Sequence, residues 1–510
     1  MLDTFSLQDF NVDELISVTG NFSSLQLICL VYNCMYIIYA GFSATICIFS
    51  GMQPNFVCSD GLYPENKCID NCTAYTYFKP EGTMVAEFNL ACGNRSFLNS
   101  MFTSGYWIGF LFGVVLSGQL LDKFGRKPIT ILNIIGLNLS TFLMYFGNNI
   151  YILILFRAMV GFFISGGQIG AFVHFTEYLP SKNIASASVL IQVIFAVGEI
   201  IAMMVGYMFK EDWKMQYLVG AMPTPFILLG SILLYPESCR WLLAVGKQVE
   251  AVKVAEKLAD INGYKHLVGK IQLVDTKELS ENPALIYSWK DLFWPVKILL
   301  LSLSSFITWF ATSIVYFGLT YGVQGLTGSI YINSFLMSSI EIPSFFAYIL
   351  TNKYGRKYPS IIFLLLSGVA VLLMPFVKHV ADGKIAVILS MIGKLCSTAV
   401  FDTLFFYQIE LFPSSVRATS IGFASMTARF AVISAPFIAK IGRISDYIPY
   451  TIFAIPTFVA ALLILFFVPE TNKKNLPETF DDVFAKYDPK HTRRKCYSKL
   501  SIRSNTPVND

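Results

Sequence analysis

Residues 385–436 read IAVILSMIGKLCSTAVFDTLFFYQIELFPSSVRATSIGFASMTARFAVISAP. The pattern predicts two membrane helices joined by a short turn that ends at Arg417. Lys394, Asp402 and Arg429 fall at depths where lipid is expected, and a charge at the bilayer centre costs at least ~2.5–3.5 kcal/mol. Such residues usually face a bundle interior or a water-filled path. We therefore interpret this pair of helices as half of a transport site.

The composition of the whole chain points to a polytopic membrane protein. Its 510 residues are 55% hydrophobic and only 14% charged, against about 25% charged in soluble domains. A net charge of +5, spread along the chain, does not indicate nucleic-acid binding. The four histidines are not clustered, and we find no nucleophile motif, metal spacing or Walker sequence. These observations exclude an enzyme or an ATP-driven pump, and predict no cofactor and no metal.

Apolar runs of the length that spans a bilayer occur twelve times. The predicted fold is therefore an all-α membrane protein with twelve transmembrane helices. We expect these helices near 25–49, 100–121, 129–147, 150–173, 186–208, 214–235, 298–318, 330–351, 358–377, 385–410, 417–440 and 447–468.

The polar segment 50–98 has the features of a loop in an oxidising compartment. It contains four cysteines, which predict two disulfides in one of three pairings: Cys58, Cys68, Cys72 and Cys92. Two acceptor sequons for N-glycans begin at Asn71 and Asn94. Cysteines in or beside the membrane helices, such as Cys239, are interpreted as packing residues.

Three motifs occur twice at nearly constant offsets. The basic loop Asp122–Lys127 (DKFGRK) recurs as Asn352–Lys357 (NKYGRK), and 352 − 122 = 230. The sequence EYLPS from Glu177 recurs as ELFPS from Glu410, and 410 − 177 = 233. The dipeptide Pro-Glu at 236 recurs at 469, an offset of 469 − 236 = 233. The repeats predict two parallel six-helix halves.

These motifs resemble those of the major facilitator superfamily, whose loop signature is G-x-x-x-D-[RK]-x-G-R-[RK]. Residues 236–242 (PESCRWL) resemble the PESPRWL signature of its organic cation, organic anion and carnitine transporters, with Cys239 in place of proline. The large first loop argues against sugar porters. The resemblance covers nearly the whole chain, and it implies a substrate site between the halves and transport by alternating access.

The predicted spans and the repeat divide the chain into five parts. They are an N-terminus at 1–24, a six-helix half at 25–235, a central segment at 236–297, a second half at 298–468 and a basic tail at 469–510. Because basic loops stay in the cytoplasm, the N-terminus, central segment and tail are expected there, and the cysteine loop outside. Residues 247–260 have the apolar spacing of an amphipathic helix.

The candidate substrate site combines charges of both signs. In cation carriers of the family helix 10 has an acidic residue where this chain has Asp402, and helix 11 has an aspartate where it has Arg429. Arginine at that position resembles anion and carnitine carriers, whereas Phe345 stands where anion carriers have lysine. A guanidinium can hold a carboxylate while an acid balances an ammonium. The candidate ligands are Arg429, Asp402, Glu341, Tyr316, Phe405, Phe406, Lys394 and Gln192.

Several assignments stay open at this point. In one alternative Arg429 and Asp402 form a permanent ion pair. Two further alternatives for Lys394 are that it neutralises Asp402 and that it extends to the membrane surface. Glu199 is either a hydrogen-bonding helix residue or a protonatable coupling group. Gating or signature roles are assigned to Gly118, Asp122, Gly125, Arg126, Arg157, Glu177, Gly355, Arg356, Glu410 and Arg417.

The function predicted from the sequence is a carrier of small organic ions in the plasma membrane, with cations or zwitterions such as carnitine favoured. An organic anion exchanger and a non-transporting membrane protein that keeps the fold are the alternatives. The partners expected are the organic ion, the lipid bilayer and a sodium or proton coupling ion, and no nucleic acid.

Overall fold

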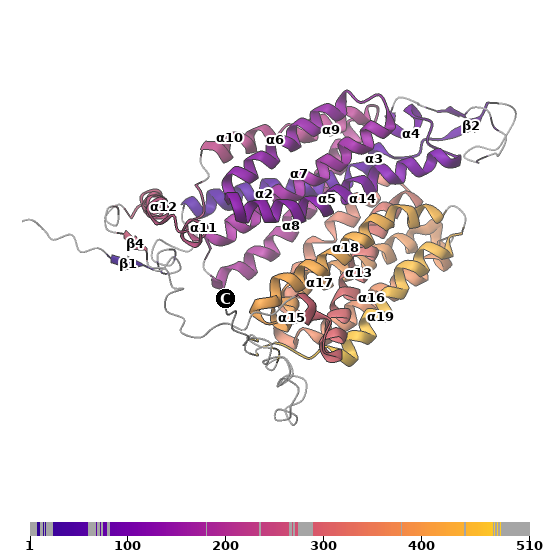
Figure 1. The fold of residues 1–510 in the computed structure, drawn as a ribbon. Coiled ribbons are helices and arrows are strands. Elements are labelled where there is room, and N and C mark those ends of the chain that lie inside the picture. The colour runs from indigo at the N-terminus through magenta and orange to yellow at the C-terminus, as the bar shows by residue number, and fades with distance from the viewer. Residues whose placement is uncertain are drawn as a thin grey trace, which may run out of the picture.

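The structure is a computed structural model, and helices make up nearly all of its ordered elements (Figure 1). It describes residues 8–10, 24–59, 75–78, 82–179, 181–233, 236–264, 271–273, 289–378, 380–442 and 445–472, with single positions between them that include Cys68 and Cys72. Among the described residues, eleven helices are long and apolar enough to cross a membrane. The twelfth predicted span corresponds to α8 (Ser181–Met208), of which Val193–Met208 is counted as a shorter apolar helix. The prediction of twelve membrane helices is confirmed.

The N-terminal half contains six spans. They are α2 (Ser24–Thr45) with its extension α3 (Cys47–Ser50), α5 (Ser96–Phe124), α6 (Arg126–Tyr145), α7 (Ile150–Glu177), α8, and α9 (Trp213–Ala221) with α10 (Thr224–Leu233). Between α3 and α5 lie the strands β2 (Phe56–Cys58) and β3 (Tyr75–Tyr77), the short helix α4 (Met84–Glu87) and the turn η2 (Gly93–Arg95).

The C-terminal half repeats this order. Its spans are α13 (Val296–Gly322), α14 (Ile330–Ser339) with α15 (Phe345–Tyr354), α16 (Lys357–Val377), α17 (Lys384–Leu411), α18 (Ser414–Ile441) and α19 (Tyr447–Phe467). Short 3-10 turns join or precede them: η5 (Trp289–Leu292), η6 (Val323–Gly325), η7 (Ile342–Ser344) and η8 (Val380–Gly383).

Two of the predicted spans are broken helices rather than continuous ones. The sixth divides into α9 and α10 beside Pro223, and the eighth divides into α14 and α15 around Pro343. Proline has no backbone N–H and clashes with the preceding turn, so the helix is interrupted there. The second break places Glu341 in a turn between two half-helices. This turn carries one of the site carboxylates described below.

The central segment adds two helices and a strand. The helices are α11 (Cys239–Ala244) and α12 (Gln248–Ile261), and the second confirms the amphipathic helix predicted at 247–260. The strand β4 (Ile271–Leu273) pairs in parallel with β1 (Gln8–Phe10), a contact between the N-terminus and the central segment that the sequence pattern did not indicate.

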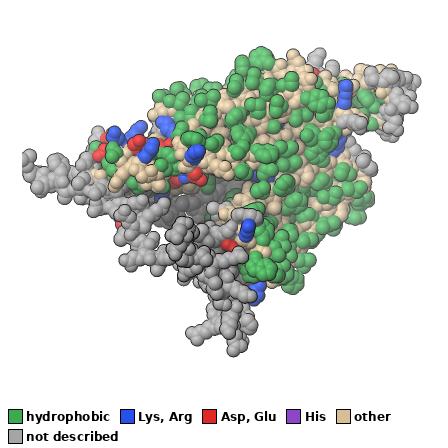
Figure 2. Space-filling model, in the orientation of Figure 1, with side chains coloured by type: hydrophobic (Ala, Val, Ile, Leu, Met, Phe, Trp, Pro, Cys, Tyr) green, Lys and Arg blue, Asp and Glu red, His purple; other side chains and the backbone are tan. Residues whose placement is uncertain are grey.

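The two halves pack chiefly through α5 against α18 and α8 against α14. Figure 2 shows hydrophobic side chains over the outer face of the helices and charged ones gathered at the end where α11 and α12 lie. An apolar belt with polar ends is the surface expected of a membrane-embedded bundle. We call the end with α11, α12 and the basic loops the signature end, and the end with residues 50–98 the cysteine-loop end.

Close helix contact in the N-terminal half depends on small residues. A Cβ atom on Gly161 of α7 would strike the carbonyl of Tyr106 on α5, and a Cβ on Gly109 would strike the carbonyl of Ala158. Because neither residue has a side chain, the two backbones approach directly.

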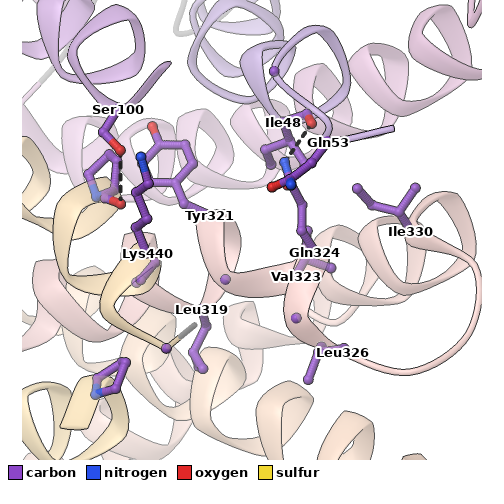
Figure 3. A pocket seen from close by; sticks show the side chains of 18 of the residues that line it. Ile48, Gln53, Ser100, Leu319, Tyr321, Val323, Gln324, Leu326, Ile330 and Lys440 are labelled. Atoms are coloured by element: carbon purple, nitrogen blue, oxygen red, sulfur yellow. Dashed lines mark hydrogen bonds between the residues drawn. The ribbon is translucent and has the colours of Figure 1, made fainter. Parts of the chain in front are cut away.

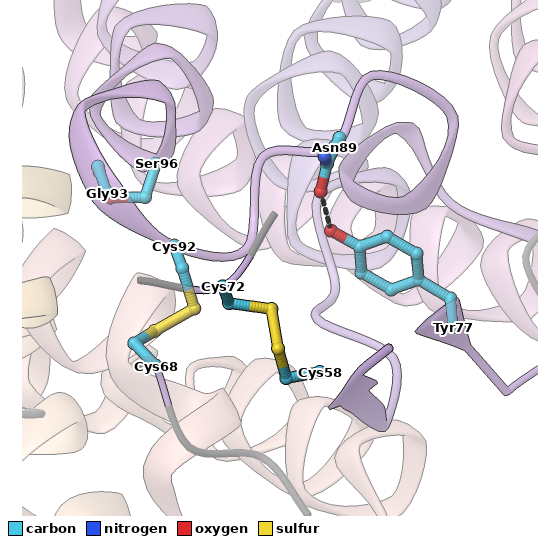
Figure 4. The surroundings of a disulfide bond; sticks show 8 residues. All are labelled: Cys58, Cys68, Cys72, Tyr77, Asn89, Cys92, Gly93 and Ser96. Atoms are coloured by element: carbon cyan, nitrogen blue, oxygen red, sulfur yellow. Dashed lines mark hydrogen bonds between the residues drawn. A yellow bond between two sulfur atoms is a disulfide. The ribbon is translucent and has the colours of Figure 1, made fainter. Parts of the chain in front are cut away.

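Figure 4 shows the two disulfides of the cysteine loop. Of the three possible pairings, the structure has Cys58–Cys72 and Cys68–Cys92. Tyr77 donates a hydrogen bond of 2.6 Å to Asn89 Oδ1, which ties β3 to the segment that leads into α5. Asn71 lies outside the described residues, and Asn94 is described only in its backbone within η2, so glycosylation at both stays a prediction.

Candidate functional site

A layer of aromatic rings from both halves lies between α5 and α13. Trp107 packs edge-on against Phe317 with ring centroids 4.7 Å apart, and Phe317 packs against Tyr316 at 4.8 Å. The indole N–H of Trp107 donates to the Tyr321 hydroxyl at 2.7 Å. Rings offer faces for cations as well as apolar surface. A charged group lies at each end of this layer.

Arg429 of α18 lies at one end of the aromatic layer. Its guanidinium carbon is 4.3 Å from the ring centre of Phe110 and 5.4 Å from that of Trp107. Within the part of the chain that the structure describes, its Nε atom has no hydrogen-bond partner and no carboxylate forms an ion pair with it. A guanidinium held on ring faces keeps its N–H groups available for an incoming carboxylate or similar acceptor.

A buried charge cluster lies at the other end, next to Tyr316. The Lys394 ammonium is 2.6 Å from Glu341 Oε1 and 3.0 Å from Glu199 Oε2, and it lies 4.8 Å from the centre of the Tyr316 ring. The Ser338 hydroxyl donates to Glu199 Oε2 at 2.9 Å. The side chains of Lys394 and Glu199 are 1% exposed, and that of Glu341 is 4% exposed. We call these four groups, Glu199, Glu341, Lys394 and Tyr316, the charge cluster.

The charge cluster joins the two halves of the protein. Glu199 comes from α8 of the N-terminal half, whereas the other three members come from the C-terminal half. Buried ions are tolerated when they are paired and their remaining hydrogen-bonding atoms are satisfied. Two of the alternatives for Lys394 do not describe its position, because it pairs with Glu199 and Glu341 rather than Asp402 and is buried rather than at the membrane surface. Its role as a ligand stays a prediction.

Asp402 lies about two and a half turns before the end of α17 at Leu411, in a contact separate from the charge cluster. Its Oδ2 accepts a hydrogen bond of 2.7 Å from the Ser344 hydroxyl, and its Oδ1 has no partner among the described residues. The structure shows no ion pair between Asp402 and Arg429, so the alternative of a permanent pair does not hold in this conformation. Both groups therefore remain available to a ligand.

None of the other predicted ligands belongs to the aromatic layer or the charge cluster in the part of the chain that the structure describes. Phe405 packs on Trp309 at 4.8 Å and on Phe401 at 5.6 Å, inside the C-terminal half. Phe406 is half-buried on the same helix. Gln192 lies on α8 where the structure describes only the backbone, so its role stays a prediction.

A water-accessible vestibule opens at the cysteine-loop end. It has a volume of about 640 Å³, within the ~300–1,000 Å³ range of ligand pockets. Figure 3 shows its lining, to which both halves contribute: Ile48, Gln53, Ser100, Tyr321, Gln324 and Lys440. A much smaller void beneath it is lined by Glu199 and Lys394, and Ile48 and Val323 line both spaces. These two apolar side chains separate the vestibule from the charge cluster.

Hydrogen bonds hold the halves together at the cysteine-loop end. The Tyr321 hydroxyl donates to the Ala44 carbonyl at 3.2 Å, and the Gln324 amide donates to the Ile48 carbonyl at 2.9 Å. Ser104 donates to the Ile433 carbonyl at 2.7 Å. Together with the apolar pair, these contacts close the path from this end to the centre.

The basic loops fold into two matching clusters at the signature end. Arg126 lies 2.8 Å from Asp122 and 3.3 Å from Glu177, and its backbone N–H donates to Glu237 at 3.0 Å. In the second half Arg356 lies 3.2 Å from Glu410, and its backbone N–H donates to Glu470 at 2.8 Å. Asn352 accepts from Arg356 at 2.6 Å where the first half has an aspartate.

The motifs repeated in the sequence therefore meet in space in each half. Because Asn352 is neutral, the second cluster has one negative charge fewer than the first. Arg417 is half-buried at the start of α18, and its Nε has no partner among the described residues.

Glycine is required at one signature position and not at another. Gly125 has φ +105°, and a Cβ there would lie 2.5 Å from Glu237 Oε2. A Cβ on Gly118 would meet nothing within 4 Å. We expect Gly125→Ala to lower the free energy of unfolding by ~1–3 kcal/mol and Gly118→Ala to change it by less than ~1 kcal/mol. Thermal unfolding of the detergent-solubilised variants measures both, and equal effects would contradict this assignment.

Burial affects two ionisable groups of the central segment. It raises the pKa of the Cys239 thiol to about 12, so this residue stays protonated and packs as a small apolar side chain. Burial also raises the pKa of Glu237, against the opposing effect of the backbone N–H groups that donate to it. The packing role predicted for Cys239 agrees with its buried position.

Arg157 is a fully buried cation within the N-terminal half. Its guanidinium donates to the Ser43 hydroxyl at 3.1 Å and to the Ser43 carbonyl. It also lies over the ring of Tyr106, with 4.6 Å to the ring centre. This contact ties α7 to α2 and α5, and it does not reach the aromatic layer's Arg429 end or the charge cluster directly.

Comparison with known proteins gives the class first and then the family. Residues 55–483 match the family described as "Sugar (and other) transporter". The proton:xylose symporter XylE superposes with a TM-score of 0.63 at 17% identity, covering 89% of this chain and 98% of that one. A partially occluded inward-open XylE from E. coli gives a TM-score of 0.65 at 16% identity, covering 89% of this chain and all of that one. The chain is a transporter with the major facilitator fold.

Its curated relatives are more specific. It is 31% identical over 440 residues to organic anion transporter 3 of Oryctolagus cuniculus, covering 84% of this chain and 80% of that one. It is also 31% identical over 451 residues to organic cation/carnitine transporter 2 of Mus musculus, with 86% and 79% coverage. The chain belongs to solute carrier family 22, whose organic ion transporters it resembles in sequence, and it is not an enzyme.

Sequence reasoning did not select several residues of this site. The sequence leaves Glu199 between two roles, and it does not indicate Trp107, Phe110, Phe317 or Ser338 as site residues. A glutamate inside a membrane span was the one available signal for Glu199. The aromatic residues gave no signal, because most phenylalanines in a membrane protein are ordinary packing residues.

Proposed function

We propose that this transporter carries small organic zwitterions that combine a carboxylate with an ammonium, of which carnitine is an example. The observation that supports the proposal most is the position of Arg429, which lies on the rings of Phe110 and Trp107 with an unpartnered Nε. Arg429 would bind the carboxylate, and the aromatic layer would accept the apolar or quaternary part. A cation on a ring face gains ~0.5–2 kcal/mol.

The ammonium end needs a negative group near the layer. Asp402 has one oxygen without a partner in the described structure, whereas Glu199 and Glu341 are occupied by Lys394. We therefore assign the ammonium to Asp402. In the present conformation the contacts beneath the vestibule close the path from the cysteine-loop end. Rocking of the halves about this site would expose it to each side in turn. The disulfides of the loop favour an oxidising exterior, and hence the plasma membrane.

A second candidate function is the transport of organic anions. It is favoured because both carboxylates of the charge cluster are already paired with Lys394, so that Arg429 is the charged group that a ligand meets on the aromatic layer. In this case Asp402 would not contact the substrate.

Uptake of three radiolabelled probes in cells tests both functions. The probes are carnitine, tetraethylammonium and a dicarboxylate such as glutarate, measured with wild type and with Asp402→Asn. We expect carnitine uptake by wild type and at least a tenfold loss in the variant. Dicarboxylate uptake that the variant retains would establish the anion function instead. Surface biotinylation controls for expression and tests the plasma-membrane location.

A further inference from the structure

The hydroxyl of Tyr316 lies within hydrogen-bond distance of more carboxylate oxygens than its single hydrogen can bind. Its oxygen lies 3.1 Å from Glu199 Oε1, and 3.0 and 2.9 Å from Oε1 and Oε2 of Glu341. A phenol has one hydrogen to donate, and an ionised carboxylate can only accept. With both glutamates ionised, one carboxylate would therefore face the hydroxyl oxygen with no hydrogen between them. A proton on either carboxyl supplies the missing hydrogen bond.

The net charge of the cluster also calls for one added proton. One ammonium faces two carboxylates, and all three side chains are at most 4% exposed. Without an added proton the cluster carries a net charge of −1, and with it the cluster is neutral. An unbalanced buried charge is costly, and a buried group relieves that cost by binding or losing a proton.

The surroundings of Glu199 supply no second cation in the described contacts. Lys394 faces it from α17, Glu341 from the turn before η7, and Tyr316 from α13. The helix α14 contributes the neutral Ser338 hydroxyl, and α2 approaches through the backbone at Gly41. Arg157 is held at Ser43, and Arg429 lies at the opposite end of the aromatic layer.

We propose that Glu199 and Glu341 together bind one exchangeable proton, and that its binding and release accompany the separation of the two halves. Binding forms one O–H bond on one carboxyl group, release returns that proton to water, and no other bond changes. When the halves separate, Lys394 stays paired with Glu341, because both belong to the C-terminal half. Glu199 then leaves with α8, without its ammonium partner.

The proton needs a route to the charge cluster, and the vestibule approaches the cluster from the cysteine-loop end. Ile48 and Val323 line both the vestibule and the small void beside Glu199 and Lys394. Ser390 lies one helical turn before Lys394 and lines the vestibule itself. A modest displacement of the two apolar side chains would connect the cluster to water at the cysteine-loop end.

Infrared difference spectroscopy of the purified transporter tests the proton without any substrate. A protonated carboxyl gives a C=O band that shifts in deuterium oxide. We expect this band in wild type, and its loss in Glu199→Gln and in Glu341→Gln, because the remaining carboxylate then balances Lys394. Lys394→Gln should strengthen the band, since both carboxyls then bind protons. Asp402→Asn serves as the control for any band from that residue. If none of the three cluster variants changes the band seen in wild type, the proposal is overturned.

Transport in liposomes tests the coupling, and this part rests on the proposed function. Carnitine counterflow is measured first, without a gradient, with the membrane voltage clamped. A gradient of one pH unit should then change steady-state carnitine accumulation by up to about tenfold for one coupled proton. Counterflow that a pH gradient does not alter would refute the coupling and leave the function intact. Absence of counterflow would refute carnitine as substrate, and the infrared result would then decide on the proton.

Discussion

Arg429→Ala is expected to reduce carnitine uptake by at least about 30-fold at low substrate concentration, with surface expression unchanged. Removing one partner of a buried, charge-assisted contact costs ~2–5 kcal/mol in binding, so the transport rate falls rather than the stability of the fold. Stability should change little, because the guanidinium forms no ion pair in the described structure and contacts its surroundings through the rings of Phe110 and Trp107.

Arg429→Lys is the matched variant for this prediction. Lysine keeps the positive charge but loses the planar fork that binds a carboxylate at two points. We expect intermediate uptake of carnitine, with a higher half-saturating concentration. Tetraethylammonium provides the opposite test, since a cation should gain from the removal of Arg429. Carnitine uptake that survives in Arg429→Ala would exclude this residue as the carboxylate ligand.

Lys394→Ala is expected to have the largest effect on stability. It leaves Glu199 and Glu341 together in the interior without their ammonium partner, 3.0 and 2.6 Å from where it lay. Removing one member of a buried ion pair typically costs ~3–5 kcal/mol. We therefore expect a clear fall in the unfolding temperature of the solubilised protein, measured by thermal unfolding in detergent.

Two further variants identify the cause of that loss. Lys384 lies exposed at the first turn of the same helix, α17, and Lys384→Ala should change the free energy of unfolding by less than ~0.5 kcal/mol. Adding Glu199→Gln and Glu341→Gln to Lys394→Ala should restore part of the stability, because two buried acids then no longer have to bind protons to become neutral. A Lys394→Ala protein as stable as wild type would show that the ion pairs contribute nothing.

The sequence by itself determined the membrane spans, the duplication and the two signature clusters. Spans follow from local hydropathy, because a helix in lipid must satisfy its own backbone hydrogen bonds whatever its neighbours are. The duplication is visible as a constant offset, and Arg356 with Glu410 accordingly repeats Arg126 with Glu177 in space. The division of the eighth span at Pro343 also had a local cause, although the sequence pattern was interpreted as one helix.

Only the tertiary structure decided which buried charges meet. Lys394 lies eight residues from Asp402 but pairs with Glu199, which is 195 residues away in the chain. On a helix eight residues correspond to a rotation of about 80°, so the two side chains of α17 face different neighbours. Which faces of α8, α13 and α17 meet depends on the packing of both halves, and no local pattern encodes it. The charge cluster and the aromatic layer could therefore be found only once the helices were assembled.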